Sequence, residues 1–239
     1  MGNKKKIELC LSPALYEEYK NPEAIAIVTD VLRASSAIVA AFMNGAKKII
    51  PVATLEEAKK MKESGYMVAA ERDGIVRDFA DFGNSPFNFT AERVKNKDIV
   101  YSTTNGTQAI QLASSSKQVL VGTFMNLDGV VEHLKKENRE VLILCAGWKN
   151  KVNIEDTLFA GAVVDALLNT DQFYTICDSA YMAQDLWLLA KDNLVEYIQK
   201  AAQRTRLQKN NLDDVIEYCH TLNLTSIVPV LKDDYLVRL

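Results

Sequence analysis

The sequence predicts an α/β protein with a largely parallel or mixed sheet and flanking helices. Short apolar runs rich in β-branched residues alternate with segments of helical periodicity, the order that builds βαβ units. Hydrophobic residues make up 48% of the 239 residues and charged residues 25%, a balance typical of folded globular proteins. A chain of this length fits one large core or two tightly joined α/β subdomains.

Seven strands are expected where apolar runs end in polar turns. The second of them is apolar up to Val28 and is followed by Asp30, which places a carboxylate at the rim of the sheet. Strands buried on both faces read as continuous apolar runs of this kind. The expected strands are residues 7–11, 24–29, 48–52, 67–70, 98–102, 118–122 and 141–145.

Capping patterns mark the helices between these strands. One helix is expected to begin after Arg33 and to stop at Gly45, because glycine readily adopts the left-handed conformation that ends helices. The next begins with a capping box of Thr54 and Glu57. Further helices are expected at residues 105–113, 126–138 and 153–168.

The pattern changes after about residue 170. Residues 179–222 are helical in pattern throughout and contain no Gly or Pro. We expect residues 170–239 to form a helical cover on the sheet or part of a second subdomain, with no flexible linker before it. The long irregular stretch at 72–89 contains two glycines and a proline, and loops of that length in compact domains are usually functional.

Composition and motifs exclude several classes of protein. The net charge of −3 does not favour nucleic-acid binding, and no apolar run is long enough to cross a bilayer. Without a signal-peptide pattern, a cytoplasmic location is expected. No dinucleotide fingerprint or Walker loop occurs, and the four cysteines lack metal-ligand spacing. The two histidines, His133 and His220, lie in helical patterns and are interpreted as surface positions.

Two strand ends pair a carboxylate with a guanidinium. Asp30 is followed by Arg33 after one apolar strand, and Glu71 by Arg72 after another. In parallel sheets, ligands bind beyond the carboxyl ends of the strands, where arginine can clamp an anion with two hydrogen bonds. The alternative is that each pair only fastens its turn.

A third strand end is rich in hydroxyl groups. Residues 102–107, Ser-Thr-Thr-Asn-Gly-Thr, lead from a strand into a helix and offer what an anion cradle needs, although one or two of them could serve only as a helix cap. Cys145 lacks the arginine of a phosphatase loop six residues on, and Asp30 lacks a second aspartate two residues on. Hydrolysis by a metal-activated water is the chemistry that remains.

Several of these segments together resemble the 2-phosphosulfolactate phosphatase family. They are residues 30–35 (DVLRAS), 71–72 (ER), 81–86 (DFGNSP), 103–107 (TTNGT) and 155–156 (ED). The resemblance spans residues 5–235 and implies the family's α/β fold, with the whole chain as a single catalytic unit. It also implies a Mg²⁺ cofactor and hydrolysis of (2R)-2-phospho-3-sulfolactate to sulfolactate and phosphate, a step associated with coenzyme M biosynthesis. Ala69, Ala70 and Ala80 depart from the family pattern and bear on substrate fit.

From the residues and the resemblance together we predict three sets of site residues. The catalytic set is Asp30, Arg33, Glu71 and Arg72. The substrate-binding set is Asn84, Ser85, Thr103, Thr104, Asn105, Gly106 and Thr107. The metal set is Asp30, Glu71, Asp81 and Asp156, of which one or two would suffice for Mg²⁺.

Two other functions stay open at this point. One is a phosphatase of the same fold that acts on another small phosphorylated 2-hydroxy acid. The other is a non-catalytic anion-binding protein. The expected partner is a small anionic phosphate ester, with no nucleic acid and no membrane, and a homodimer is an open alternative to a monomer.

Overall fold

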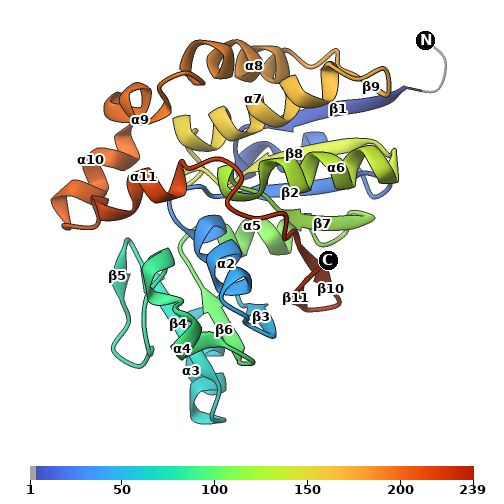
Figure 1. Ribbon diagram of the computed structural model, residues 1–239. Coiled ribbons are helices and arrows are strands. Elements are labelled where there is room, and N and C mark those ends of the chain that lie inside the picture. Colours follow the sequence, from blue (N-terminus) through green and yellow to red (C-terminus); the bar gives the residue numbers. More distant parts are fainter. Residues whose placement is uncertain (1–3) are drawn as a thin grey trace.

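The structure is a computed structural model that describes residues 4–239, and it contains a sheet of 11 strands with helices around it (Figure 1). The strands are β1 (Lys5–Cys10), β2 (Ile25–Thr29), β3 (Lys48–Pro51), β4 (Met67–Arg72), β5 (Ile75–Val76), β6 (Asp98–Ser102), β7 (Gln118–Val121), β8 (Val141–Cys145), β9 (Phe173–Tyr174), β10 (Pro229–Lys232) and β11 (Tyr235–Arg238). The predicted α/β class is therefore confirmed.

The helices lie mostly between consecutive strands. They are α1 (Tyr16–Tyr19), α2 (Ala34–Met43), α3 (Leu55–Glu63), α4 (Ala91–Val94), α5 (Gly106–Ala113), α6 (Leu127–Glu137), α7 (Ile154–Leu168), α8 (Asp178–Ala190), α9 (Leu194–Tyr197), α10 (Ala202–Lys209) and α11 (Ile216–Cys219). Short 3-10 helices cover Pro13–Leu15, Pro86–Asn88, Phe124–Asn126, Ile198–Lys200 and Asp213–Val215. None of the helices within residues 4–239 is both long enough and apolar enough to cross a membrane.

The sheet consists of two parallel groups joined by a hairpin. The strand order is β5-β4-β6-β3-β11-β10-β7-β2-β8-β1-β9. Strands β4, β6 and β3 are parallel to one another, as are β7, β2, β8, β1 and β9. The antiparallel hairpin β10–β11 lies between the groups and pairs with β7 and with β3 through one residue pair each. The sequence predicted β1, β2, β3, β4, β6, β7 and β8, but neither this hairpin nor the two-residue strands β5 and β9.

The hairpin reverses the strand direction between the two groups. The pairings β3–β11, β11–β10 and β10–β7 are all antiparallel, so β2 and β8 run in the opposite sense to β4 and β6 along the sheet. Figure 1 shows the two groups oriented differently, with β1, β2 and β8 in one and β3, β4 and β6 in the other. The sequence had suggested that the residues following β2 and β4 share one edge of a single parallel sheet. They do not, because the two strands run in opposite senses.

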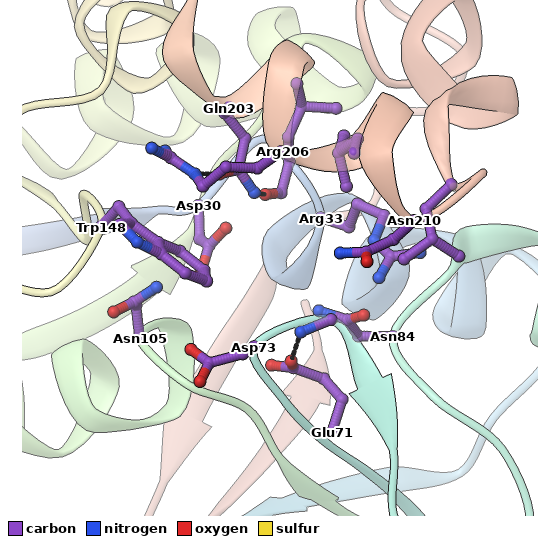
Figure 2. Close-up of a pocket in the computed structure, with 14 residues that line it drawn as sticks. Asp30, Arg33, Glu71, Asp73, Asn84, Asn105, Trp148, Gln203, Arg206 and Asn210 are labelled. Carbon is purple, nitrogen blue, oxygen red and sulfur yellow. Dashed lines mark hydrogen bonds between the residues drawn. The ribbon is translucent and has the colours of Figure 1, made fainter.

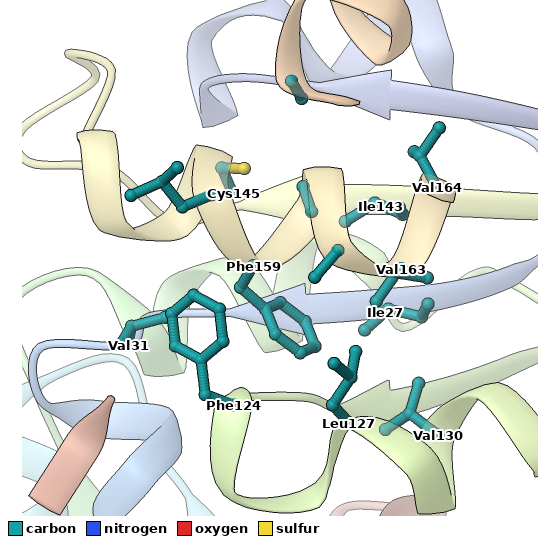
Figure 3. Packing of buried hydrophobic residues seen from close by; sticks show 14 of the residues in the cluster. Ile27, Val31, Phe124, Leu127, Val130, Ile143, Cys145, Phe159, Val163 and Val164 are labelled. Carbon is teal, nitrogen blue, oxygen red and sulfur yellow. The ribbon is translucent and has the colours of Figure 1, made fainter. Parts of the chain in front are cut away.

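The central strands are buried on both faces because helices cover both. Every residue of β2 and of β8 is buried. Helices α6 and α7 cover one face, where Ile27, Ile143, Phe159 and Val163 pack in a common core (Figure 3). Helix α8 packs on the outer side of α7, which is why nearly all of α7 is buried.

Local signals in the sequence fixed the helix ends largely as expected. Thr54 and Glu57 form both hydrogen bonds of a capping box at the start of α3. Gly45 follows α2 with φ +86°. The prediction that His220 lies on the surface is wrong: the side chain is 5% exposed and packs against the Phe124 ring, with centroids 5.4 Å apart.

Candidate active site

A cavity lies where the ends of strands from both parallel groups converge (Figure 2). Asp30 and Trp148 follow β2 and β8 of one group, whereas Glu71 ends β4 and Asn105 follows β6 of the other. Helix α10 closes a further side. The space between these residues is about 400 Å³ when its open mouth is counted.

Asp30 is held at the floor of this cavity by the turn between β2 and α2. Its backbone N–H donates to Ser35 Oγ at 2.8 Å, and the Ser35 N–H donates to the Asp30 carbonyl, also at 2.8 Å. The side chain is 6% exposed, and it accepts a long hydrogen bond of 3.4 Å from the Ala34 N–H to Oδ1. Burial raises the pKa of Asp30 well above the usual range, and the neighbouring carboxylates of Asp156 and Glu71 raise it further.

Gly106 allows helix α5 to approach this carboxylate closely. A Cβ at this position would lie 3.0 Å from Asp30 Oδ2 and 2.6 Å from the Ala34 Cβ. Any larger residue would therefore push α5 away from the start of α2. The glycine of the Thr-Thr-Asn-Gly-Thr segment thus serves the packing around Asp30.

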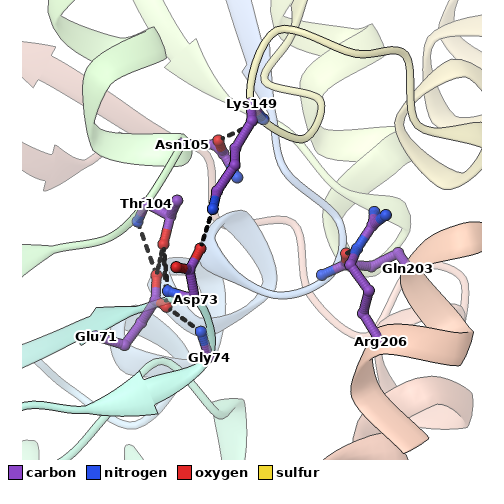
Figure 4. Close-up of polar contacts among 8 residues, drawn as sticks. All are labelled: Glu71, Asp73, Gly74, Thr104, Asn105, Lys149, Gln203 and Arg206. Carbon is purple, nitrogen blue, oxygen red and sulfur yellow. Dashed lines mark hydrogen bonds and ion pairs between the residues drawn. The ribbon is translucent and has the colours of Figure 1, made fainter. Parts of the chain in front are cut away.

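Glu71 organises two turns of the cavity wall (Figure 4). Its Oε1 accepts hydrogen bonds from the Thr104 N–H at 2.8 Å and the Thr104 hydroxyl at 3.1 Å, and its Oε2 accepts from the Gly74 N–H at 2.7 Å. The Asp73 N–H donates to Thr104 Oγ1 at 2.9 Å. The carboxylate of Glu71 is thus largely occupied by protein donors, which favours a role in holding β4 and the 103–107 turn together.

Arg33 places a positive charge in the cavity. Its side chain is 5% exposed, and it forms no ion pair with a carboxylate among residues 4–239. It lies close enough to Asp30 to lower the pKa of that carboxyl, against the larger effect of burial. A buried guanidinium without a carboxylate partner is suited to binding an anion.

The first turn of α7 brings two more carboxylates to this region. Asp156 accepts hydrogen bonds from the Val31 N–H at 2.8 Å and the Gly147 N–H at 3.0 Å, which ties the turns after β2 and β8 together. Glu155 is fully buried, and neither of its oxygens has a hydrogen-bond partner within the described chain. Burial raises the pKa of Glu155 to about 7 and that of Asp156 to about 8.

Three of the predicted catalytic and metal-binding residues, Arg72, Asp81 and Asp156, do not line the cavity. Arg72 donates to the carbonyls of Glu71 and Ala53 at 2.6 and 2.9 Å and to Ser102 Oγ at 3.0 Å, so its guanidinium fastens β4 to its neighbours. Asp81 pairs with Lys62 at 2.6 Å and accepts from the Val68 N–H, near the opposite end of β4 from Glu71.

The predicted substrate-binding residues separate into two kinds. Asn84 and Asn105 line the cavity, whereas Ser85, Thr103, Thr104, Gly106 and Thr107 do not. Thr103 and Thr107 are hydrogen-bonded to each other, because the Thr107 N–H donates to Thr103 Oγ1 and the Thr103 N–H to Thr107 Oγ1, both at 3.2 Å. The hydroxyl-rich segment therefore stabilises its own turn and supports Glu71.

The sequence did not single out Glu155, Trp148, Gln203 or Arg206 as site residues. Glu155 stood in the 155–156 segment of the family resemblance and in a helix start, but only its neighbour Asp156 was predicted as a metal ligand, because the helix dipole already explained both acidic residues. Gln203 and Arg206 lie in α10, 48 or more residues beyond Glu155, and no local pattern indicates that this helix reaches the cavity.

Asp30 and Glu155 have the chemistry of Mg²⁺ ligands. Mg²⁺ is usually bound by one or two carboxylates and several waters. Glu155 offers two buried oxygens without partners, and Asp30 offers a carboxylate with one long hydrogen bond. Within residues 4–239 no three acidic, His or Cys side chains are grouped closely enough to coordinate one ion by themselves, so water would complete the coordination.

Comparison with known proteins identifies close relatives of this chain. A family model described as 2-phosphosulpholactate phosphatase matches residues 10–234. A probable 2-phosphosulfolactate phosphatase of Thermotoga maritima is 37% identical over 86% of this chain and 88% of the relative. Proteins with the same description from Caldanaerobacter subterraneus and Clostridium acetobutylicum are 32% and 33% identical, over 91% and 94% of this chain and 94% and 96% of their own lengths.

Proposed function

This chain belongs to the 2-phosphosulpholactate phosphatase family, and from that premise we propose that it hydrolyses (2R)-2-phospho-3-sulfolactate to sulfolactate and phosphate with Mg²⁺ as cofactor. The observation that carries the proposal is that the buried side chains of Asp30 and Arg33 line one cavity, and that Arg33 forms no ion pair with a carboxylate in the described chain. Such a pair can hold a cation and a phosphoryl group side by side.

The cavity presents two guanidinium groups to an anionic substrate, beside the carboxylates of Asp30, Glu71 and Asp73. The proposed substrate carries a phosphate, a carboxylate and a sulfonate, so its binding requires several cations and N–H donors. Arg33 and Arg206 both line the cavity, and the side-chain amides of Asn84 and Asn105 add hydrogen-bond donors. A neutral ester would leave these guanidinium groups without partners.

Each residue has a defined task in the proposed hydrolysis. Water adds to phosphorus, and the ester oxygen leaves as the hydroxyl group of sulfolactate. Arg33 would stabilise the charge that develops on the phosphoryl oxygens. Asp30 and Glu155 would hold Mg²⁺, which when bound supplies charge neutralisation and activates water. Asp156 and Glu71 would keep the surrounding turns in place through their hydrogen bonds to backbone N–H groups.

The proposal includes a cellular context. The family resemblance associates this hydrolysis with coenzyme M biosynthesis, and we propose a cytoplasmic location for it. The nearest alternative substrate is another small phosphorylated 2-hydroxy acid, such as phospholactate, because the same cavity would bind its phosphate and carboxylate.

The test is a panel of phosphate esters assayed with Mg²⁺ and with a chelator. We expect the sulfonated substrate to have the highest kcat/KM and the chelator to abolish phosphate release. Asp30→Asn should lower kcat by about 10²-fold or more, since it removes the charge that holds the cation. Asp233→Asn, in an exposed turn, is the matched control, and thermal melts verify the fold of both variants. Near-normal turnover in Asp30→Asn would remove Asp30 from the mechanism.

A further inference from the structure

The cavity contains a second guanidinium group on the wall opposite Glu71. Arg206 reaches the cavity from α10, and Figure 2 shows it above Asp30, away from Glu71 and Asn84. Like Arg33, it forms no ion pair with any carboxylate in the described part of the chain. One anion would leave one of these two cations without a partner.

Arg206 is fixed in place by uncharged groups. Its Nε donates to Gln203 Oε1 at 2.6 Å and its Nη2 to Asn153 Oδ1 at 3.3 Å. The guanidinium carbon lies 4.7 Å from the centre of the Trp148 ring, a distance at which cation and ring attract each other. Gln203 is anchored in turn, because its Nε2 donates to the Leu32 carbonyl at 3.0 Å.

This arrangement orients the guanidinium group, and no carboxylate of the described chain lies within ion-pair distance of it, while Glu155 interacts with its charge at longer range. A guanidinium has five N–H donors, and the hydrogen bonds to Gln203 and Asn153 occupy two of them. Stacking on Trp148 restricts the plane of the group, so the remaining donors point in a defined direction at little entropic cost on binding. Polar groups that are held in a fixed orientation at a cavity in this way typically serve ligand recognition.

We propose that Arg206, stacked on Trp148, binds the anionic group that the substrate carries in addition to its phosphate. This inference rests on the proposed function and assigns Arg33 to the phosphoryl group, because Arg33 is the cation beside Asp30. The substrate then lies between α10 and the strand ends, and Arg206 determines selectivity for doubly functionalised phosphate esters. The group that it binds is an oxyanion, either sulfonate or carboxylate.

Three substrates separate these sources of negative charge. They are 2-phospho-3-sulfolactate, 2-phospholactate, which lacks the sulfonate, and the phosphate ester of 2-hydroxyethanesulfonate, which lacks the carboxylate. The variant is Arg206→Gln, and the matched control is Arg204→Gln, which removes the same charge from the same helix outside the cavity. Arg206→Lys retains the charge without the planar fork and serves as a second variant.

We expect Arg206→Gln to lower kcat/KM for the full substrate by about 10- to 100-fold, mainly through KM, since a charge-assisted hydrogen bond is lost. For the ester that lacks the group bound by Arg206, the same substitution should lower kcat/KM by less than about threefold, which is within the range of effects of surface substitutions. Arg204→Gln should behave as wild type on all three esters, and Arg206→Lys should fall between wild type and Arg206→Gln.

An equal loss on all three esters, or no loss on any, would overturn the inference. If the wild type releases no phosphate from the sulfonated ester, the proposed function fails, and calorimetric titration with sulfolactate then decides the inference alone. Binding at least about 10-fold weaker in Arg206→Gln than in Arg204→Gln would support it. Equal binding by the two variants, or no binding by any form of the protein, would refute it.

Discussion

Glu155 is a fully buried carboxylate near the candidate site, and neither of its oxygens finds a hydrogen-bond donor within residues 4–239. Burial of an ionised carboxylate without compensation costs several kcal/mol, which is why the pKa of Glu155 rises to about 7. In the proposed function, a cation bound at Glu155 would offset this cost.

The first prediction is that Glu155→Gln separates stability from cation binding. At pH 8, above the pKa of about 7, we expect the metal-free variant to be more stable than wild type by on the order of 1 kcal/mol, because a buried charge is removed. Wild type should gain thermal stability when Mg²⁺ is added, whereas the variant should not. The measurement is a thermal melt with Mg²⁺ or with a chelator.

Glu92→Gln makes the same change on an exposed helix and serves as the control for Glu155→Gln. It should leave both the melting temperature and the response to Mg²⁺ unchanged. If Glu155→Gln retained the full Mg²⁺-dependent shift, Glu155 would not be a ligand.

Burial shifts the pKa of His220 downward, in the opposite direction from that of Glu155. Its Nε2 has no hydrogen-bond partner in the described chain, and burial lowers the pKa of the ring from 6.5 to about 4. The native ring is therefore neutral between pH 6.5 and 4, whereas the unfolded ring takes up a proton there. Because the unfolded state binds more protons, stability is lost as pH falls through this window.

The second prediction follows from this linkage. His220→Phe should lose about 3 kcal/mol less unfolding free energy than wild type between pH 6.5 and 4, since 2.5 pKa units correspond to that amount. Urea titrations at several pH values measure the difference. Parallel pH profiles for the two proteins would show that His220 does not titrate in this range.

At the scale of elements, Arg72 illustrates how a strand-end residue acquires a structural role. Its guanidinium spans from β4 to the carbonyl of Ala53 and the hydroxyl of Ser102 at the end of β6. Burial lowers its pKa, and Glu71 is the first of the groups that oppose this effect. It therefore stabilises the ends of β4 and β6, on which Glu71 and the 103–107 turn depend.

The third prediction is that Arg72→Ala acts on stability rather than on substrate binding. Loss of three hydrogen bonds from a charged donor should lower the unfolding free energy by about 1–3 kcal/mol. KM should change little, because the side chain does not line the cavity. Arg77→Ala, in the following turn, should have a much smaller effect on stability. A raised KM at unchanged stability would instead return Arg72 to the substrate site.

Elements whose signals are local could be predicted from the sequence, and those that depend on distant contacts could not. The capping box of Thr54 and the glycine after α2 are local, and both were predicted. The direction of the Arg72 side chain depends on its hydrogen bond to Ser102, 30 residues away. The burial of His220 depends on its packing against Phe124. The sequence located Asp30 and Arg33 because both follow a strand end, but Arg206 reaches Trp148 only through tertiary packing.

At the scale of the whole molecule, the cavity depends on how the two parallel groups of strands are joined. Asp30 and Trp148 come from one group and Glu71 and Asn105 from the other. The hairpin β10–β11 provides the sheet connection between the groups, through Val230 opposite Leu120 and Leu236 opposite Ile49. The last ten residues of the chain thus help to hold together a site to which they contribute no side chain.

Leu236 provides the test of this connection. It is 0% exposed and packs in the core that contains Ala26, Val28 and Ile49. The Leu236 side chain therefore anchors the hairpin in this core. The fourth prediction is that Leu236→Ala lowers the unfolding free energy by about 2–5 kcal/mol, as expected for a large-to-small change in a close-packed core. It should also lower kcat, since the two halves of the cavity lose part of their common support. Leu222→Ala, at a site that is 42% exposed, is the control and should cost less than about 1 kcal/mol in urea titrations. A loss at Leu236 as small as that at Leu222 would mean that the two groups are held together without the hairpin.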